Sequence, residues 1–266
     1  MKELTPAQYD SVRPLFTSLT HYLTPEAIFA GLTPGRVFAD APNAPQTAVA
    51  WYGHRAFVVG RADEPTQQQM ADWWRDVVLL ERAKSGLGGL VLHVDTTWAQ
   101  YITAVCTPPT PQVYTRRAYR LDARGASWAV DFPADFRLRS VAADLLADER
   151  VQNKAYLTEE MVSERPSTED FLAKSFGVCL LHEQEIVGWC LSEYNCGPRC
   201  EIGIAVAEPF RRRGLATLMA RAFIDQALTQ GVYDIGWICW AGNRPSVATA
   251  EKLGFTLADE RDVFVA

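Results

Sequence analysis

The sequence of 266 residues lacks several features that would each define a class of protein. No apolar run approaches the roughly 18 residues that a membrane-spanning helix requires, and the opening residues, Met1 to Pro6, show no apolar segment behind a basic flank, as a signal peptide would. Positive charge is scarce, because 26 Lys and Arg face 32 Asp and Glu, a net charge of -6. Nucleic-acid binding needs a basic surface. We therefore expect a soluble, cytoplasmic protein with neither a membrane nor a nucleic-acid partner.

Cysteine is present without a C-x-x-C pair. The six cysteines lie mostly inside apolar runs: Cys106, Cys179, Cys190, Cys196, Cys200 and Cys239. This pattern predicts reduced thiols. Cys190 and Cys239 fall in predicted strands, where a thiol nucleophile is conceivable, but no histidine or carboxylate stands at a spacing that would activate it, so we favour core thiols. Cys196 and Cys200 lack a second pair of ligands, and we expect no metal.

The length suits two domains of ordinary size. Hydrophobic residues at 48% and charged residues at 22% match globular averages. A segment containing Gly125 and Pro133, residues 122–133, reads as a linker. We therefore expect one domain over residues 1–130 and a second over residues 131–266.

The first half predicts a mixture of helices and strands without a catalytic motif. Thr5-Pro6 is typical of a helix start, and a capping box of Thr66 and Gln69 predicts another helix, which carries Trp73 and Trp74 toward the core. The short apolar runs flank turn residues and predict strands, and the two runs on either side of Gly53 suggest a hairpin. These strands span residues 36–40, 48–51, 56–60, 90–94 and 113–121.

The second half predicts antiparallel strands followed by a parallel one. Strand-like runs at residues 136–140, 177–182, 186–194 and 200–206 are followed by one at 234–240. The last three runs before residue 206 are joined by short turns, which favour antiparallel pairing. The run at 234–240 follows a helix of the length that a crossover between parallel strands requires. Short helices are expected near residues 142–150 and 158–162. A third is expected from Ser167, because Ser167 followed by Asp170 resembles a capping box at a helix start.

A basic loop joins the strand ending at Val206 to the crossover helix. Three arginines, Arg211 to Arg213, are followed by Gly214 and Ala216. A helix N-terminus carries unpaired N–H groups and partial positive charge, and a glycine lets the backbone approach a ligand closely. The loop therefore suggests a cradle for phosphate oxygens. A solvated basic helix start is the alternative.

The order of these motifs resembles the GCN5-related N-acetyltransferase superfamily. The resemblance rests on Arg211-x-x-Gly214-x-Ala216 after a strand, then Asn243, Ser246 and Leu253-Gly254-Phe255. The whole chain is similar to two-domain acetyltransferases of the zwittermicin-resistance type, in which the first half resembles a degenerate copy of the fold. The resemblance implies an α/β fold with a mixed sheet, acetyl-CoA as co-substrate, a small-molecule amine as acceptor, and a monomer or homodimer.

The resemblance also implies a set of residues that bind acetyl-CoA. It places the pantetheine and the oxyanion on backbone groups at a strand end, and the phosphates on the basic loop. The residues so assigned are Ile204, Ala205, Val206, Arg211, Arg212, Arg213, Gly214, Leu215, Ala216, Thr217 and Asn243.

Catalysis in this superfamily proceeds by direct attack of the amine on the thioester in a ternary complex. Glu193 and Glu201 are the candidate bases, with a slight preference for Glu193, although each could be a carboxylate at the rim of a strand. The tyrosine that often protonates the leaving thiolate is replaced here by Ala250. Ser246, Tyr194 or water could donate instead, and Ser246 could equally cap its helix.

Two other functions remain open at this point. A non-catalytic protein that binds or senses acyl-CoA would account for Ala250. An interaction scaffold with a decayed site is disfavoured, because Arg211, Gly214 and Ala216 are all intact.

Overall fold

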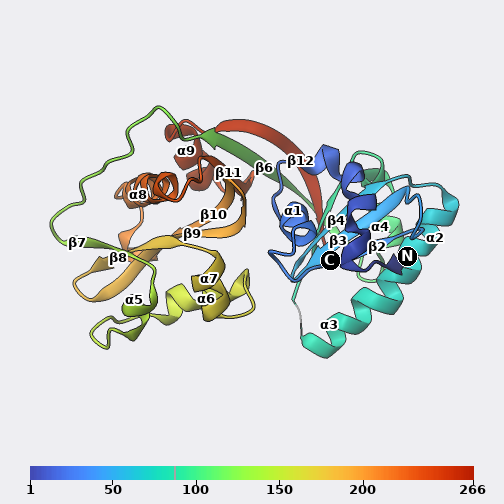
Figure 1. Cartoon of the computed structure of the whole chain (residues 1–266), viewed down its shortest axis with the longest axis horizontal. Helices are drawn as coiled ribbons and strands as arrows, with labels where there is room; N and C mark the ends of the chain where they lie inside the picture. Colours follow the sequence, from blue (N-terminus) through green and yellow to red (C-terminus); the bar gives the residue numbers. More distant parts are fainter. Residues whose placement is uncertain (87) are drawn as a thin grey trace. The chain divides into compact units, whose positions relative to one another are not determined.

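The computed structural model describes residues 1–86 and 88–266, which divide into two compact units. The first unit comprises Met1–Arg117 and Glu260–Ala266, and the second comprises Ala118–Asp259. Each unit has a sheet flanked by helices (Figure 1), so the expected mixed α/β class is confirmed. The boundary expected after residue 130 falls inside the second unit, and the last seven residues of the chain belong to the first.

The sheet of the first unit is mixed. Its strands, in spatial order, are β1 (Lys2–Glu3), β2 (Arg36–Ala39), β3 (Thr47–Tyr52), β4 (Arg55–Gly60), β5 (Val91–Val94) and the end of β12 (Thr256–Val265). The predicted hairpin is confirmed, because β3 and β4 pair antiparallel from Thr47 with Gly60 to Tyr52 with Arg55. Strands β4 and β5 are parallel, whereas β5 and β12 are antiparallel.

The predicted helix start at Thr5 is confirmed, but the segment forms two 3-10 helices rather than one continuous helix, since Pro14 lacks an N–H. The predicted cap of the long helix was wrong. The cap of the long helix is Asp63, whose carboxylate accepts a hydrogen bond from the Thr66 N–H at 3.2 Å. The helical elements are η1 (Pro6–Ser11), η2 (Arg13–Leu19), α1 (Thr24–Phe29), α2 (Glu64–Trp73), the π-helical η3 (Trp74–Val78), α3 (Leu79–Ser85), η4 (Trp98–Gln100) and α4 (Ile102–Val105).

The two adjacent tryptophans belong to the core of the first unit, as predicted. Trp73 makes edge-on contacts with Phe38 and Trp51, at ring-centroid distances of 5.6 and 5.9 Å. Trp74 is buried, and its indole donates a hydrogen bond to the Pro108 carbonyl. This core also includes a residue from the far end of the chain, Phe264 on β12. The first unit is therefore completed by a strand that the sequence pattern did not predict.

The second unit has the strand order β6-β11-β10-β9-β8-β7. Its strands are the end of β6 (Gln112–Asp122), β7 (Phe136–Ser140), β8 (Gly177–His182), β9 (Glu185–Cys196), β10 (Arg199–Val206) and β11 (Asp234–Trp240). The predicted pairing is confirmed: β8, β9 and β10 are successively antiparallel, and β11 lies parallel to β10. Strand β7, whose pairing was not predicted, lies antiparallel to β8. The helical elements are α5 (Ala143–Ala147), α6 (Ala155–Ser163), α7 (Thr168–Lys174), η5 (Glu208–Phe210), α8 (Leu215–Thr229) and α9 (Arg244–Lys252). Ser167 caps α7, as expected.

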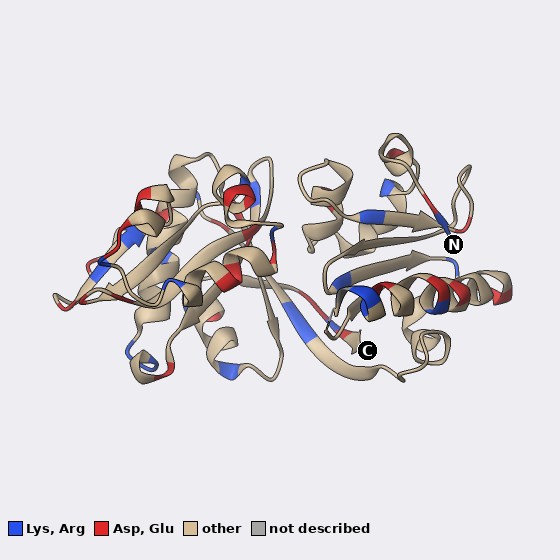
Figure 2. Ribbon diagram, turned by 90° about the horizontal axis from the view of Figure 1, so that it is seen from below, with Lys and Arg blue, Asp and Glu red and all other residues tan. Residues whose placement is uncertain are grey.

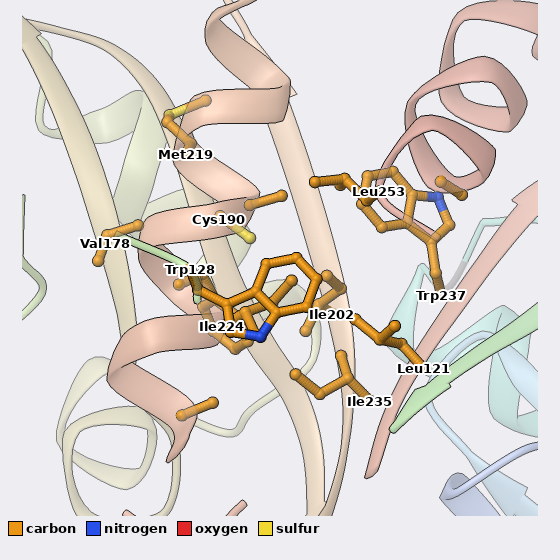
Figure 3. Close-up of a cluster of buried hydrophobic side chains, with 14 of the residues drawn as sticks. Leu121, Trp128, Val178, Cys190, Ile202, Met219, Ile224, Ile235, Trp237 and Leu253 are labelled. Carbon is orange, nitrogen blue, oxygen red and sulfur yellow. The ribbon is translucent and has the colours of Figure 1, made fainter. Parts of the chain in front are cut away.

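Alternating side chains of this sheet bury both of its faces. On β9, Val187 and Cys190 join a core formed with α8 and α9, part of which is drawn in Figure 3. Trp189 and Leu191, on the opposite face of the same strand, join a second core with α5 to α7. Such two-sided burial is typical of a sheet that is covered by helices on both faces.

Strands β10 and β11 pair over only four positions and then separate. The register runs from Arg199 with Asp234 to Ile202 with Trp237. Beyond this point β10 continues to Val206 and β11 to Trp240, and the described register contains no further pair between them. Within the described residues, the separation leaves one edge of β10 without a strand neighbour, and a cleft forms here.

Charged side chains are distributed over both units. Figure 2 shows acidic and basic residues interspersed along helices, strands and loops of each unit. Among the described residues, no helix is long and apolar enough to cross a membrane.

Phe264 should stabilise the first unit although it lies close to the chain end. Its side chain is 4% exposed, so Phe264→Ala should lower the free energy of unfolding by about 3–5 kcal/mol. Leu257, on the same strand, is 52% exposed, and Leu257→Ala is the matched control, with an expected effect within about 0.5 kcal/mol. Urea denaturation would measure both, and equal effects would contradict the packing assigned to β12.

The cysteines should differ sharply in reactivity. All six are thiols, and all but Cys196 are buried. Burial raises the pKa of Cys179 to about 12, so only about one molecule in ten thousand carries that thiolate at pH 8. Burial likewise raises the pKa of Cys106, Cys190 and Cys200.

Iodoacetamide at pH 8 should therefore modify Cys196 first in the folded protein. Mass spectrometry of tryptic peptides would locate the label, and the same reaction in concentrated guanidinium, where all six thiols should react, is the control. Labelling of Cys190 in the folded protein at the rate of Cys196 would show that this thiol is accessible and would contradict its place in the core.

Candidate active site

A cleft of about 690 Å³ lies where β10 and β11 separate. It is lined by the end of β10, the loop containing η5, the first turn of α8, one side chain of β11, and α9 with its cap. Ten of the eleven residues that the resemblance assigned to acetyl-CoA line this cleft: Ile204, Ala205, Val206, Arg211, Arg212, Gly214, Leu215, Ala216, Thr217 and Asn243. Ser246 lines it as well, whereas Arg213 does not.

The loop before α8 is shaped by two residues with left-handed backbone conformation. Arg212 has φ of 63° and Gly214, the residue that precedes the helix, has φ of 78°. A Cβ atom at Gly214 would meet no protein atom within 4 Å. Glycine is therefore required here by the backbone conformation rather than by packing within the protein. It also leaves the cleft open directly in front of the helix.

The first turn of α8 presents backbone donors to the cleft. The first backbone hydrogen bond of the helix runs from the Leu218 N–H to the carbonyl of Gly214, the residue before the helix, at 3.2 Å. The amides of Leu215, Ala216 and Thr217 precede it and have no partner within the helix. Unpaired amides at the positive end of a helix dipole have the chemistry that suits an anion such as phosphate.

The three arginines of the loop have different environments. The Arg211 Nε donates to the Val206 carbonyl at 2.9 Å and so ties the loop to the end of β10. The Arg213 guanidinium lies 5.4 Å from the Phe210 ring centroid and donates to the Pro209 carbonyl at 3.3 Å. Arg212 lines the cleft. The three arginines are consecutive in the sequence, and the sequence alone did not distinguish these environments.

The cap of α9 is Asn243, which corrects one interpretation of Ser246. The Asn243 Oδ1 accepts a hydrogen bond from the Ser246 N–H at 3.3 Å, so Ser246 lies in the first turn rather than at the cap. The Ser246 hydroxyl oxygen accepts a hydrogen bond from the Trp237 indole at 2.9 Å. Ala250, one turn further on, is buried and carries no donor.

A β-bulge in β9 places Glu193 next to Gly203 of β10. The pairing of β10 with β9 passes from Glu201 with Tyr194 to Ile202 with Ser192, so Glu193 is the extra residue. A Cβ on Gly203 would overlap the Glu193 carboxylate and would lie 3.5 Å from the Glu160 Oε1 of α6. Glycine at 203 therefore makes room for two carboxylates next to Ile204, a residue of the cleft.

Glu201 and Tyr194 occupy more enclosed positions than Glu193. Glu201 is 3% exposed and lies against Gly236, its partner on β11, where an added Cβ would come within 3.1 Å of the Glu201 Cγ. The Tyr194 hydroxyl donates to the Glu164 carboxylate at 2.5 Å, and both residues are buried. The Tyr194 proton is therefore already engaged within the protein.

Several residues of this region were not singled out from the sequence. They are Glu160, near Gly203, and five residues of the cleft lining: Glu208, Phe210, Trp237, Pro245 and Thr249. Trp237 sits in an apolar run that is typical of a core strand, and Glu160 lies on a helix far away in sequence, so no spacing rule links either to the loop. Pro245 and Thr249 could have been found, because they are four residues apart on a helix that also carries Ser246.

Within the described residues, no group of three or more His, Cys, Asp or Glu side chains is arranged to hold a metal ion.

Comparison with known proteins agrees with this architecture. An uncharacterised N-acetyltransferase of Bacillus subtilis, YdfB, is 24% identical over 264 residues, which cover 99% of this chain and 98% of that protein. A GCN5-related N-acetyltransferase-like protein from Streptococcus suis superposes with a TM-score of 0.72 at 23% identity, covering 97% of this chain and 98% of that one. A tandem GNAT protein from the clavulanic acid biosynthesis pathway gives a TM-score of 0.62 at 14% identity, with coverage of 100% and 97%.

These structures show that the GNAT fold accounts for both halves of the chain, as the resemblance implied. The GNAT acetyltransferase family itself matches residues 13–264. The match extends over nearly the whole sequence and both units, and the protein therefore belongs to the GNAT acetyltransferase family.

Proposed function

We propose that the protein transfers an acetyl group from acetyl-CoA to a primary amine of a small molecule, by direct attack in a ternary complex. The observation that carries this proposal is the adjacency of two features at the end of β10. The cleft with its helix amides begins at Ile204, and a pair of carboxylates lies over the preceding residue, Gly203.

The cleft has the chemistry that an acyl-CoA requires. The amides at the start of α8 and the Arg212 side chain suit phosphate oxygens. The backbone of Ile204 to Val206 has no neighbouring strand on the side of β11, so its polar groups suit the amides of the pantetheine chain. Its volume of about 690 Å³ is in the range of ligand sites.

Acyl transfer also needs stabilisation for the oxyanion that forms on the thioester carbonyl. Fixed backbone N–H groups at the end of β10 serve this purpose without a side chain. Val206, in the cleft lining, is the residue we assign to this role, because the next N–H, that of Ala207, donates to the Val187 carbonyl of β9, and successive N–H groups point to opposite edges of a strand.

The carboxylates favour an amine as the acceptor. Glu193 and Glu160 would attract a protonated amine, and Glu193, directly or through a water molecule, would remove the proton that the amine must lose before attack. The buried Glu201 is the less suitable base, since it lies against Gly236 rather than over the strand end.

Direct attack is favoured over a thiol intermediate. Cys190 and Cys239 are both buried, and burial raises the pKa of Cys190, which suppresses its nucleophilic thiolate. In the direct reaction the amine nitrogen bonds to the carbonyl carbon, the carbon–sulfur bond breaks, and its electron pair leaves with sulfur. Ser246 is the hydroxyl of the cleft that we assign to the departing sulfur.

The alternative is a protein that binds acyl-CoA without catalysis, which the buried Ala250 favours. Two measurements separate the functions. Thermal unfolding with and without acetyl-CoA tests binding, and release of CoA in the presence of a panel of primary amines tests transfer. A thermal shift without CoA release from any amine would favour the binding protein, and no shift at millimolar acetyl-CoA would contradict both.

Gly214→Val should abolish acetyl-CoA binding. At 100 times its Kd, the ligand should add about 2.7 kcal/mol to the wild-type stability, and the variant should lose this gain because its side chain projects toward the cleft. Gly231→Val is the matched control, since Gly231 has a similar φ of 76°, also meets no atom within 4 Å, and lies outside the cleft lining. If both variants respond to acetyl-CoA as the wild type does, the assignment of the loop is wrong.

Glu193→Gln should slow the transfer without weakening the binding of acetyl-CoA. Loss of a general base typically costs about 10²-fold or more in kcat, whereas the acetyl-CoA thermal shift should persist. Glu185→Gln, at the exposed start of the same strand, is the control and should leave kcat within about twofold. Unchanged kcat in Glu193→Gln would remove Glu193 from the mechanism.

A further inference from the structure

Trp237 lies at the point where the two parallel strands separate. It belongs to the last pair of the register, opposite Ile202, and it lines the cleft. The side chain is 2% exposed, and its ring meets Phe255 edge-on at 5.5 Å. Leu253 belongs to the same core and is drawn with Trp237 in Figure 3. The ring is therefore held in one orientation.

The indole of Trp237 fixes the direction of the Ser246 hydroxyl. An indole N–H can only donate, so the hydrogen bond of 2.9 Å makes the Ser246 oxygen the acceptor. The hydroxyl proton must then be offered elsewhere. The Thr249 hydroxyl, one turn away, donates a hydrogen bond to the Pro245 carbonyl at 2.8 Å. Among the described residues, no acceptor is found for the Ser246 hydroxyl proton.

The free side of the Ser246 hydroxyl is the cleft, which both residues line. The Ser246 backbone is fixed as well, since its N–H donates to the Asn243 cap at 3.3 Å. Because the Trp237 indole donates to one side of the Ser246 oxygen, the hydroxyl proton points to the other side, toward the cleft. Ala250 offers no competing donor on the next turn of the helix.

We infer that Trp237 is a positioning residue, which orients the Ser246 hydroxyl so that it donates a hydrogen bond to the sulfur of CoA as the thiolate leaves. This inference rests on the proposed function for its place in the reaction. Ser246 keeps its proton throughout: the electron pair of the carbon–sulfur bond goes to sulfur, the hydrogen bond stabilises that charge, and the proton lost by the amine goes to Glu193 or water.

The test compares Trp237→Phe, which keeps a ring but removes the donor, with Ser246→Ala and with the double variant. We expect kcat to fall about fivefold in Trp237→Phe and about tenfold in Ser246→Ala, with KM for acetyl-CoA within about twofold of the wild type, in line with the loss of one hydrogen bond to a charge. The double variant should be no slower than Ser246→Ala, because the indole acts only through the hydroxyl.

Trp128→Phe is the matched control. The Trp128 indole is buried in the same core and donates to the Ala123 carbonyl at 2.9 Å, but it does not line the cleft. Its substitution should lower stability without changing kcat. A fall in kcat for Trp237→Phe that is just as large in the Ser246→Ala background would assign Trp237 a packing role and overturn the inference.

A second readout does not require an acceptor amine. The thiol of bound CoA should titrate at lower pH in the wild type than in Trp237→Phe or Ser246→Ala, by about one unit, because the hydroxyl stabilises the thiolate. Ultraviolet absorbance of the thiolate, followed against pH with CoA bound, measures this difference. Identical titrations in wild type and Trp237→Phe would overturn the inference, whereas the expected difference without CoA release from any amine would uphold it and count against the proposed transfer reaction alone.

Discussion

The structure of the second unit depends on the separation of two parallel strands. After four residue pairs, β10 and β11 stop sharing hydrogen bonds, and the backbone polar groups of Gly203 to Val206 lose a neighbour on one side. A buried polar group without a partner costs about 1–3 kcal/mol, so this edge must face water or a ligand. The separation therefore creates a cleft whose wall is a row of backbone donors and acceptors. The loop, the start of α8 and the cap of α9 close around that row.

Small residues make room for the carboxylates around this edge. Gly203 stands beneath Glu193 and Glu160, and Gly236 stands beside Glu201. A Cβ at Gly203 would collide with the Glu193 carboxylate, and a Cβ at Gly236 would crowd the Glu201 Cγ. The bulge at Glu193 adds to this arrangement, because it inserts one extra side chain next to Gly203 and shifts the pairing of β9 with β10 by one residue. Glycine within a strand costs conformational entropy. At these two positions it leaves space for neighbouring glutamate side chains.

Most of the strands and their pairing could be predicted, because short turns and apolar runs leave few choices. The basic loop was equally visible, since it lies in a single stretch from Arg211 to Thr217. What escaped prediction depends on contacts between distant segments. The polar alternation of β12 hid a strand that completes the first unit, and the cap of α2 shifted to Asp63 because its carboxylate reaches the Thr66 N–H. Likewise, the hydrogen bond from Trp237 to Ser246 joins a strand to a helix, and neither residue alone suggests it.

The first unit repeats the arrangement of strands but closes the corresponding cleft. Its parallel strands β4 and β5 also pair over four positions, from Arg55 with Val91 to Val58 with Val94. Immediately beyond, the Asp95 carboxylate accepts a hydrogen bond from the Gly60 N–H at 2.7 Å, and the Asp95 N–H donates to the Val58 carbonyl, so the strands are joined where β10 and β11 part.

The helix that follows β4, α2, begins with acidic residues, whereas basic residues precede α8 in the second unit. Asp63 caps α2, and Glu64 opens its first turn, where the second unit presents Arg212 and Gly214 before α8. A carboxylate that already occupies the helix N-terminus both satisfies its amides and repels a phosphate. The start of α8 therefore faces a cleft, whereas α2 is capped by its own carboxylate, and this difference in local chemistry is why we propose acetyl-CoA binding in the second unit alone.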